Sequence, residues 1–323
     1  MTDNETTTIQ PTVKKRRRAA IGEFARLDPA IFGLPLFRPM PRRWKTKEDN
    51  WRNQSREYDI KFNGEQIHIV CPYMLTSSDL GILLALLSLS GQDRHTRILT
   101  PVSFPHHEDF IKNALKTKGK ISEYPHITVT CSYDDLLEVA GISVRKHTKK
   151  DLREKLRRLR AVFCERTVII GNQEVTKSSG DEQLLGYDSL NEDGDNVITL
   201  SERLTAAILG KPYIRVPMPL WRKLSSEVAR ILYVRLCVLI REGEIKTKSM
   251  DDIVSMVYGD SAGGTQQQIK DQRRAIKNAF DEINKLGDWT IEINTKVGVM
   301  HYDLARKTRQ GREAAQHAME LER

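Results

Sequence analysis

Two segments of the chain place cationic side chains on one face of an expected helix. The first runs from Thr148 to Val162. Its apolar residues Leu152, Leu156 and Leu159, continued by Phe163, recur at helical spacing and predict a buried stripe. At about 100° per residue, six cations share one flank of that stripe without an intervening acid. They are Lys146, Lys149, Lys150, Arg153, Arg157 and Arg160. Stacked like charges cost helix stability unless a partner compensates, so the flank favours a DNA backbone or major groove over a merely solvated face.

The second segment, from Thr265 to Leu286, adds a polar side chain to a flank of the same kind. Its expected buried residues are Ile269, Ile276, Phe280 and Ile283. The adjoining flank carries Gln266, Lys270, Arg273, Arg274 and Lys277. Gln can make paired hydrogen bonds with adenine, and Arg with guanine, in the major groove. We therefore expect this helix to read bases and the first helix to hold phosphates, with an ordinary solvated helix start as the alternative for the second.

The chain lacks the residue patterns that support catalysis or hold a cofactor. It contains no Gly-x-x-x-x-Gly-Lys-[Ser/Thr] loop for nucleotide phosphates. His106 and His107 are adjacent and would point apart on a helix, without the i,i+4 spacing of a metal site. A strand-borne His-x-His pair with a nucleophilic tyrosine, as in nicking enzymes, is also absent. We predict a protein that is not an enzyme, with no catalytic residues, no metal and no cofactor.

Charge and composition favour a polyanionic partner. The 323 residues include 52 Lys+Arg against 43 Asp+Glu, a formal net charge of +9. The cysteines, Cys71, Cys131, Cys164 and Cys237, form no Cys-x-x-Cys pair, which indicates reduced thiols in a cytosol. No apolar run approaches the roughly 20 residues of a membrane helix, and the amino terminus lacks the apolar core of a secretory signal. We expect a cytoplasmic protein without a membrane partner.

The two cationic helices occupy matching places in a repeated order of elements. Each follows a short helix that a serine opens, Ser132 in the first copy and Ser249 in the second. Each precedes two strand-like segments: Thr167 to Ile170 with Leu184 to Tyr187 in the first copy, and Trp289 to Ile293 with Val299 to Leu304 in the second. Short helix, turn, long helix and β-hairpin is the order of a winged helix-turn-helix. We predict an α+β fold with two tandem winged helix-turn-helix domains related by duplication.

The rest of the chain is divided around these domains. Residues 1–26 are predicted to be a disordered basic arm, 27–57 an irregular Pro-containing segment, 58–200 the first winged-helix domain, 201–305 the second, and 306–323 a basic C-terminal tail.

Local signals predict further elements within these domains. Alternation around Asn63-Gly64 predicts a hairpin from Tyr58 to Ile69, and Thr76 is expected to cap a helix that ends at Leu89. Ser225 is expected to cap a helix that anchors the second domain, and Asn191 to Asn196 to form an acidic solvent loop.

Several blocks of residues resemble plasmid replication initiators of the IncQ RepC type, with TrfA-like initiators as a more distant comparison. The most specific block is Leu224-Ser225-Ser226-Glu227-Val228-Ala229-Arg230-Ile231-Leu232. A second is Leu286-Gly287-Asp288-Trp289-Thr290, in which Asp288 interrupts the family's usual Leu-Gly-Trp. Looser similarity extends these blocks to about Asp28 to Leu304.

That resemblance implies a bacterial initiator that binds double-stranded DNA at direct repeats (iterons) of a replication origin. Such a protein promotes local opening of AT-rich DNA, and a replicative helicase and a primase follow it. The sequence leaves a homodimer open. The alternatives are a winged-helix transcriptional repressor, a nucleoid protein without site preference, and a nicking or priming enzyme, which the absence of an acid cluster disfavours.

Overall fold

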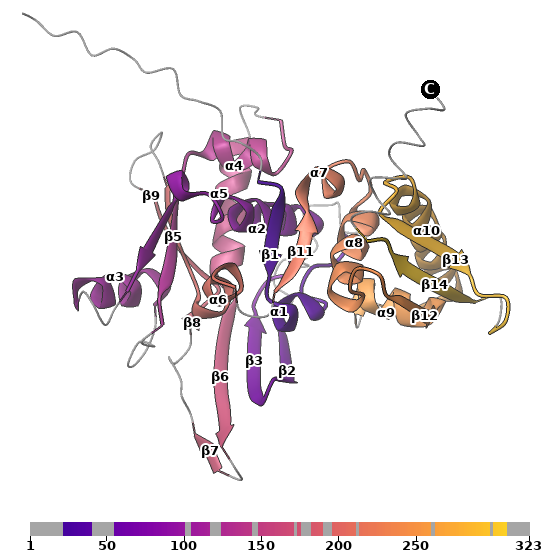
Figure 1. Cartoon of the computed structure of the whole chain (residues 1–323), viewed down its shortest axis with the longest axis horizontal. Coiled ribbons are helices and arrows are strands. Elements are labelled where there is room, and N and C mark those ends of the chain that lie inside the picture. The colour runs from indigo at the N-terminus through magenta and orange to yellow at the C-terminus, as the bar shows by residue number, and fades with distance from the viewer. Residues whose placement is uncertain are drawn as a thin grey trace, which may run out of the picture.

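The computed structural model describes residues 22–40, 55–100, 105–116, 124–143, 148–170, 173–175, 182–189, 196–210, 213–259, 262–297 and 300–308. Residues 1–21 of the expected basic arm, 191–195 of the expected acidic loop and 309–323 of the expected tail lie outside these ranges, whereas Asn196, the last residue of that loop, belongs to a strand. The elements form two groups along the long axis of the molecule (Figure 1), one from β2 to α6 and one from α8 to β14. None of the described helices is long and apolar enough to cross a bilayer.

The amino-terminal elements lie between the two groups. Strand β1 (Phe24–Leu27) pairs antiparallel with β11 (Ile214–Pro217), and Asp28 then caps α1 (Pro29–Gly33) through the N–H groups of Ala30 and Ile31. The predicted arm therefore ends earlier than residue 26, and the segment 27–57 is not irregular throughout. The strand is four residues long and its partner is far along the chain, so no local pattern predicted it.

An antiparallel sheet opens the first half. The expected hairpin is confirmed as β2 (Arg56–Phe62) and β3 (Glu65–Cys71), with Asn63 and Gly64 both at positive φ in the turn. Strand β3 also pairs with β6 (Phe163–Ile170), which pairs in turn with β7 (Gln173–Val175) and β8 (Glu182–Gln183). The β6–β7 arm extends away from the body in Figure 1.

The other elements of the first half surround a buried helix. As expected, Thr76 and Asp79 form a capping box at the start of α2 (Ser77–Leu89), which is buried on nearly every side. After the 3₁₀ turn η3 (Asp93–His95) come β4 (Thr96–Leu99), α3 (Pro105–Leu115), β5 (His126–Cys131), α4 (Tyr133–Val139) and α5 (Thr148–Arg160). Strands β9 (Leu185–Ser189) and β10 (Asn196–Leu200) complete a sheet of order β4-β5-β10-β9, and α6 (Glu202–Ile208) follows.

The second half has a simpler order. Helix α7 (Met218–Trp221) and α8 (Glu227–Leu239) lead into β12 (Ile245–Ser249), α9 (Met250–Tyr258) and α10 (Gln266–Asn284). Strands β13 (Trp289–Ile293) and β14 (His301–Arg306) then form a sheet of order β12-β14-β13. Ser226, not the expected Ser225, caps α8 by accepting from the N–H of Ala229.

The sheets that accompany α5 and α10 share a strand order, but the hairpin predicted after α5 is wrong. Strand β6 pairs with β3, and β9 pairs with β10, so Thr167–Ile170 and Leu184–Tyr187 do not form one hairpin. In the first half the order is β5-β10-β9, and in the second it is β12-β14-β13. Each sheet thus contains the strand before the short helix and two later strands. Strands β6 to β8 are an insertion in the first half that the repeat pattern did not indicate.

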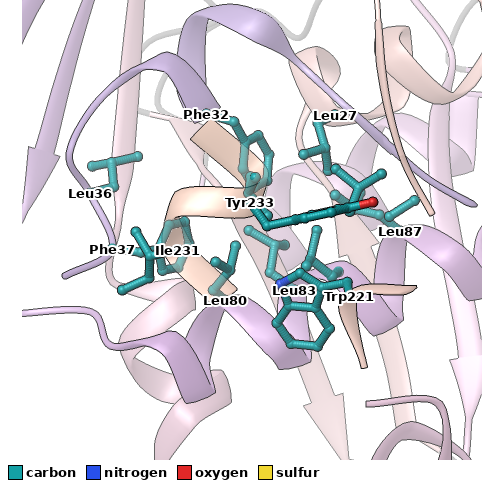
Figure 2. Packing of buried hydrophobic residues seen from close by; sticks show 14 of the residues in the cluster. Leu27, Phe32, Leu36, Phe37, Leu80, Leu83, Leu87, Trp221, Ile231 and Tyr233 are labelled. Carbon is teal, nitrogen blue, oxygen red and sulfur yellow. The ribbon is translucent and has the colours of Figure 1, made fainter. Parts of the chain in front are cut away.

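One hydrophobic core runs through both halves of the molecule. Figure 2 shows α2 residues such as Leu83 and Leu87 beside Trp221 and Tyr233 of the second half. Gly81 permits this approach, because a Cβ atom there would lie 2.9 Å from the Trp221 ring. Helix α6, which the predicted boundary placed in the second domain, packs on β1, β5 and β10. The packing therefore fixes α5 and α10 on a common scaffold.

Candidate nucleic-acid interface

Helix α5 is held by its leucine stripe and by one buried ion pair. Leu152, Leu156 and Leu159 are fully buried, as the spacing predicted. Phe163 is not part of the helical stripe, because α5 ends at Arg160 and Phe163 begins β6, where it is half-buried. On the same helix, the Arg158 guanidinium donates to Asp79 Oδ1 at 2.6 Å from Nη2 and 3.2 Å from Nε. The Asp79 side chain is fully buried and also caps α2, so this contact fixes the position of α5 against α2.

The predicted cationic flank of α5 divides into outward and inward residues. Lys150 and Arg157 are exposed and make no hydrogen bond or ion pair among the described residues. Lys149 is half-buried, and Lys146 lies outside the described residues. The helical angle accounts for this difference, because Lys150 and Arg157 lie farthest around the helix from the leucine stripe.

Arg153 and Arg160 are turned toward the protein. Arg153 Nε donates to the Tyr133 hydroxyl at 3.1 Å, and its guanidinium lies 5.3 Å from the centre of the Tyr133 ring. Arg160 donates to Gln183 Oε1 at 3.2 Å and to the Tyr187 carbonyl at 3.4 Å. These residues therefore join α5 to α4 and to strands β8 and β9.

The Tyr133 hydroxyl continues this connection into the sheet. It makes a hydrogen bond with the hydroxyl of Tyr187, which donates to Asn196 Oδ1 at 3.3 Å. Asn196 Nδ2 donates in turn to the Cys131 carbonyl at 3.2 Å. A chain of hydrogen bonds thus runs from the face of α5 to β5, β9 and β10, and it fixes the strands relative to the cationic helix.

Helix α10 begins with a capping box and lies with one face in the core. Thr265 accepts from the N–H of Gln268, while Gln268 Oε1 accepts from the N–H of Thr265. Ile276, Phe280 and Ile283 are buried as predicted, whereas Ile269 is half-buried.

Near its carboxyl end, α10 is joined to the start of α8. The Glu282 carboxylate accepts from the N–H and the hydroxyl of Ser225 at 2.9 and 3.0 Å, and from the N–H of Ser226 at 3.2 Å. Partial burial raises the pKa of Glu282, but these hydrogen bonds outweigh it and lower the pKa below its ordinary value. Ser225 therefore connects two helices in place of the expected cap.

The flank of α10 also divides. Gln266, Lys270 and Lys277 are exposed, and none makes a hydrogen bond or ion pair among the described residues. Arg273 donates to Asp251 Oδ1 of α9 at 2.7 Å, and Arg274 donates to Asp271 Oδ1 at 2.6 Å. Arg273 lies close to the buried stripe around the helix, which places it against α9, whereas the Arg274 side chain remains 67% exposed.

Sequence reasoning missed two residues of this surface. Lys296 is exposed in the turn between β13 and β14, where Asn294 Oδ1 accepts from the N–H groups of Lys296 and Val297 and shapes the turn. The position of Lys296 in the hairpin that follows a cationic helix could have indicated it as a DNA contact. Asp251 belongs to the start of α9. Its contact with Arg273 joins two different helices, so the spacing of residues within one helix could not predict it.

The histidines show contacts that the sequence did not suggest. His68 Nδ1 lies 2.8 Å from Asp59 Oδ1. His126 Nε2 lies 3.3 Å from Glu182 Oε1 in a buried position. Among the described residues, no three His, Cys, Asp or Glu side chains are grouped as metal ligands. The expectation of a protein without catalytic residues, metal or cofactor stays a prediction.

Known proteins resemble this chain in sequence and in fold. The family model for Replication protein C (RepC) matches residues 23–305. No curated protein matches the sequence. Among solved structures, a crystal structure of domains 2 and 3 of RctB is 12% identical and covers 87% of this chain and 98% of its own, with a TM-score of 0.51. A second RctB structure, of residues 155–483, is 12% identical, covers 89% of this chain and 99% of its own, and has a TM-score of 0.48.

The first RctB match supports a mixed α/β fold shared with RctB domains 2 and 3. The family match covers the blocks around Ser225 and Asp288 that carried the resemblance. Asp288, which interrupts the family's usual Leu-Gly-Trp sequence, is buried and accepts a hydrogen bond from the Tyr233 hydroxyl at 2.5 Å. The departure in sequence is therefore accommodated by a specific contact in the core of the second half.

Proposed function

The chain belongs to the RepC family of replication proteins, and we propose that it is an initiator that binds double-stranded DNA at direct repeats of a replication origin. In this proposal each half of the molecule is a winged helix-turn-helix. Helix α4 with α5, and α9 with α10, are the two helix pairs. Strands β9–β10 and β13–β14 are the two wings.

The observation that carries the proposal is the exposed outer side of α10. Gln266, Lys270 and Lys277 follow one another along its outer side without a partner in the described part of the chain. The hairpin with Lys296 belongs to the same sheet that packs on this helix. A helix that enters a major groove and a hairpin that contacts the flanking backbone require this combination of outward polar and cationic side chains.

The two helices differ in what they offer to DNA. Helix α5 presents Lys150 and Arg157 outward, and where such side chains contact phosphates they position the helix without reading sequence directly. Helix α10 adds Gln266, which can pair with adenine. It also adds Arg274, which can exchange its exposed contact with Asp271 for paired hydrogen bonds to a guanine. We assign phosphate binding to α5 and base reading to α10.

The family resemblance extends the proposal to later events. Binding at direct repeats promotes opening of neighbouring AT-rich DNA, and a replicative helicase and a primase then act on the opened strands. The protein itself acts without catalysis and in the bacterial cytoplasm. Two copies of the chain on adjacent repeats are compatible with this role, and sedimentation with and without DNA measures whether they associate.

A footprint on the parental replicon tests the proposal. Overlapping fragments of that replicon are first ranked by gel shift at one fixed salt concentration, because affinity for DNA is uninterpretable without it. The best fragment is then digested with DNase I in the presence of the protein. We expect regularly spaced protection over direct repeats beside an AT-rich stretch. Protection confined to a promoter would favour a repressor. Equal binding of all fragments in the gel shift would favour a nucleoid protein.

A further inference from the structure

The two-stranded ribbon of β1 and β11 presents one apolar face to the core and a different face to solvent. The ribbon lies between the two groups of elements in Figure 1. Its inner side chains are fully buried: Ala25, Leu27 and Val216. Because side chains alternate along a strand, Phe24 and Arg26 of β1 and Arg215 of β11 belong to the outer face. This face is separate from α5 and α10, the helices assigned to duplex DNA.

Aromatic rings and guanidinium groups contact one another on the outer face. The guanidinium of Arg215 lies 5.8 Å from the centre of the Phe24 ring and 5.5 Å from the centre of the Tyr213 ring. The guanidinium of Arg26 lies 5.0 Å from the same Tyr213 ring. Arg215 Nη2 also donates to the Tyr213 hydroxyl at 2.8 Å. We call these four linked side chains the ribbon platform: Phe24, Arg215, Tyr213 and Arg26.

The two positive charges of the platform are not neutralised within the described part of the chain. Arg26 and Arg215 lie directly opposite each other in the register of the ribbon, and neither makes an ion pair with a described residue. Like charges in this position weaken the pairing of two strands. The hydrogen bond from Arg215 lowers the pKa of Tyr213, and the charges of both arginines act in the same direction. The platform therefore favours a ligand that supplies negative charge.

The platform also has groups open to such a ligand. A guanidinium has five N–H donors. Arg26 uses one of them on the Ile208 carbonyl at 2.5 Å, and Arg215 uses one on the Tyr213 hydroxyl. The other N–H groups can donate to phosphate oxygens. Phe24 is 36% exposed, which leaves part of its ring accessible.

We propose that the ribbon platform binds single-stranded DNA. Unstacked bases stack on aromatic rings and on guanidinium planes, while arginines contact the phosphates of the strand. A duplex keeps the faces of its bases inside the helix, so exposed rings give it nothing to stack on. An acidic protein segment would use the charges of the platform but not the ring faces. Two rings interleaved with two arginines therefore fit a single strand best.

This inference rests on the proposed function, because opening of AT-rich DNA supplies the single strand. In that role α5 and α10 hold the duplex repeat, and the platform holds one of the separated strands nearby. A surface that binds the single strand and not the duplex shifts the opening equilibrium toward the open form. The ribbon joins both halves of the molecule, so a strand held there stays on the same scaffold as the duplex contacts.

Fluorescence anisotropy with the full chain tests the platform. The probes are a labelled oligo(dT) of about 16 nucleotides, the upper site size of a single-strand-binding fold, and a labelled duplex of the origin repeat, both at one fixed salt concentration. We expect the protein to bind both. Binding of the duplex alone would overturn the platform and leave the proposed function intact. Binding of oligo(dT) alone would support the platform and contradict the proposed function.

Two changes at Tyr213 separate the ring from its hydrogen bond. Tyr213→Leu removes the ring without changing the net charge and should weaken oligo(dT) binding about tenfold, as expected for one base stacked on an aromatic ring. Tyr213→Phe keeps the ring and loses only the hydrogen bond from Arg215, so it should bind like the wild type. Equal weakening by both changes, or equal weakening of duplex binding by Tyr213→Leu, would contradict a stacking platform.

A matched pair of arginine changes tests the charge. Arg97 of β4 is the control, because its side chain is exposed and makes no hydrogen bond or ion pair with a described residue. We expect Arg215→Gln to weaken oligo(dT) binding and Arg97→Gln to leave it unchanged. Equal weakening would indicate a general effect of net charge and would contradict the proposal. Unlabelled poly-glutamate is the competitor; if it displaces the probe as well as oligo(dT) does at equal charge, the surface fits an acidic protein segment and the proposal fails.

A photo-crosslink locates the bound strand on the wild-type protein. The oligo(dT) carries iodouracil in place of one thymine, which crosslinks to aromatic side chains that stack on it, and the attached peptides are identified by mass spectrometry. We expect peptides that contain Phe24 or Tyr213. Crosslinks confined to other parts of the chain would overturn the platform.

Discussion

Lys150 and Arg157 are the α5 cations on which salt dependence should rest. Both face solvent without a partner in the described structure, whereas Arg153 and Arg160 are engaged with Tyr133 and Gln183. Affinity falls as salt concentration rises, so the plot of log affinity against log salt concentration has a negative slope. Replacing Lys150 and Arg157 together by Ala should make this slope less steep, by about 0.9 for each phosphate that the variant no longer neutralises. The slope is measured by fluorescence anisotropy with an origin duplex. An unchanged slope would identify the flank as a solvated face.

Gln266 should contribute to sequence discrimination rather than to overall affinity. Loss of one paired hydrogen bond to a base costs on the order of 1 to 3 kcal/mol of discrimination, so Gln266→Ala should lower the ratio of specific to non-specific affinity by about tenfold or more. Lys150→Ala is the matched control and should weaken both affinities about equally. Competition binding with cognate and scrambled duplexes at one salt concentration measures this ratio. If Lys150→Ala lowers the ratio more, α5 is the base reader.

At the scale of elements, one buried ion pair fixes α5 against α2. The Asp79 side chain is shielded from water and pairs with Arg158, so Asp79→Ala leaves the Arg158 charge without its partner and removes a helix cap. We expect a loss of about 3 to 5 kcal/mol in the free energy of unfolding, measured with urea. Asp271→Ala removes the exposed partner of Arg274 and should cost less than about 1 kcal/mol. Equal losses would mean that the buried pair does not position α5.

The contact between α10 and α8 should depend on pH through Glu282. Its pKa is lower in the folded protein than in the unfolded chain, so its stabilising contribution is present above the ordinary pKa of about 4.3 and is lost as the pH falls through the lowered value. Glu282→Gln should reduce stability by about 1 kcal/mol at pH 7, a figure for hydrogen bonds partly screened by water.

Urea unfolding of both proteins at pH 7 and pH 3 measures this difference. The gap between the wild type and Glu282→Gln should narrow at pH 3, where the carboxyl group takes up a proton. A gap that stays constant would show that the charge on Glu282 does not hold α8 to α10.

Across the whole molecule, local sequence signals predicted individual helices and turns but did not predict which distant strands pair with each other. The caps at Thr76 and Ser132 and the Asn63-Gly64 turn involve residues a few positions apart, and all are present. The β1–β11 pairing and the β3–β6 pairing join segments far apart in sequence, where no local pattern distinguishes one partner strand from another.

The same distinction applies to the candidate interface. Helical angle predicted which side of α5 and α10 is buried, because the apolar stripe is a property of each helix alone. It did not predict that Arg153 and Arg273 are engaged, since their partners Tyr133 and Asp251 belong to other helices. The set of outward cations is therefore smaller than the predicted flanks.

We propose that α5 and α10, held on one core, contact the same repeat at two places. Hydroxyl-radical footprinting of a single repeat measures this directly, with the wild type, a Lys150→Ala/Arg157→Ala variant and a Gln266→Ala/Lys277→Ala variant. We predict two protected segments about one helical turn apart, one weakened by the α5 changes and the other by the α10 changes. A single protected segment, or loss of the same segment in both variants, would contradict simultaneous contact by α5 and α10.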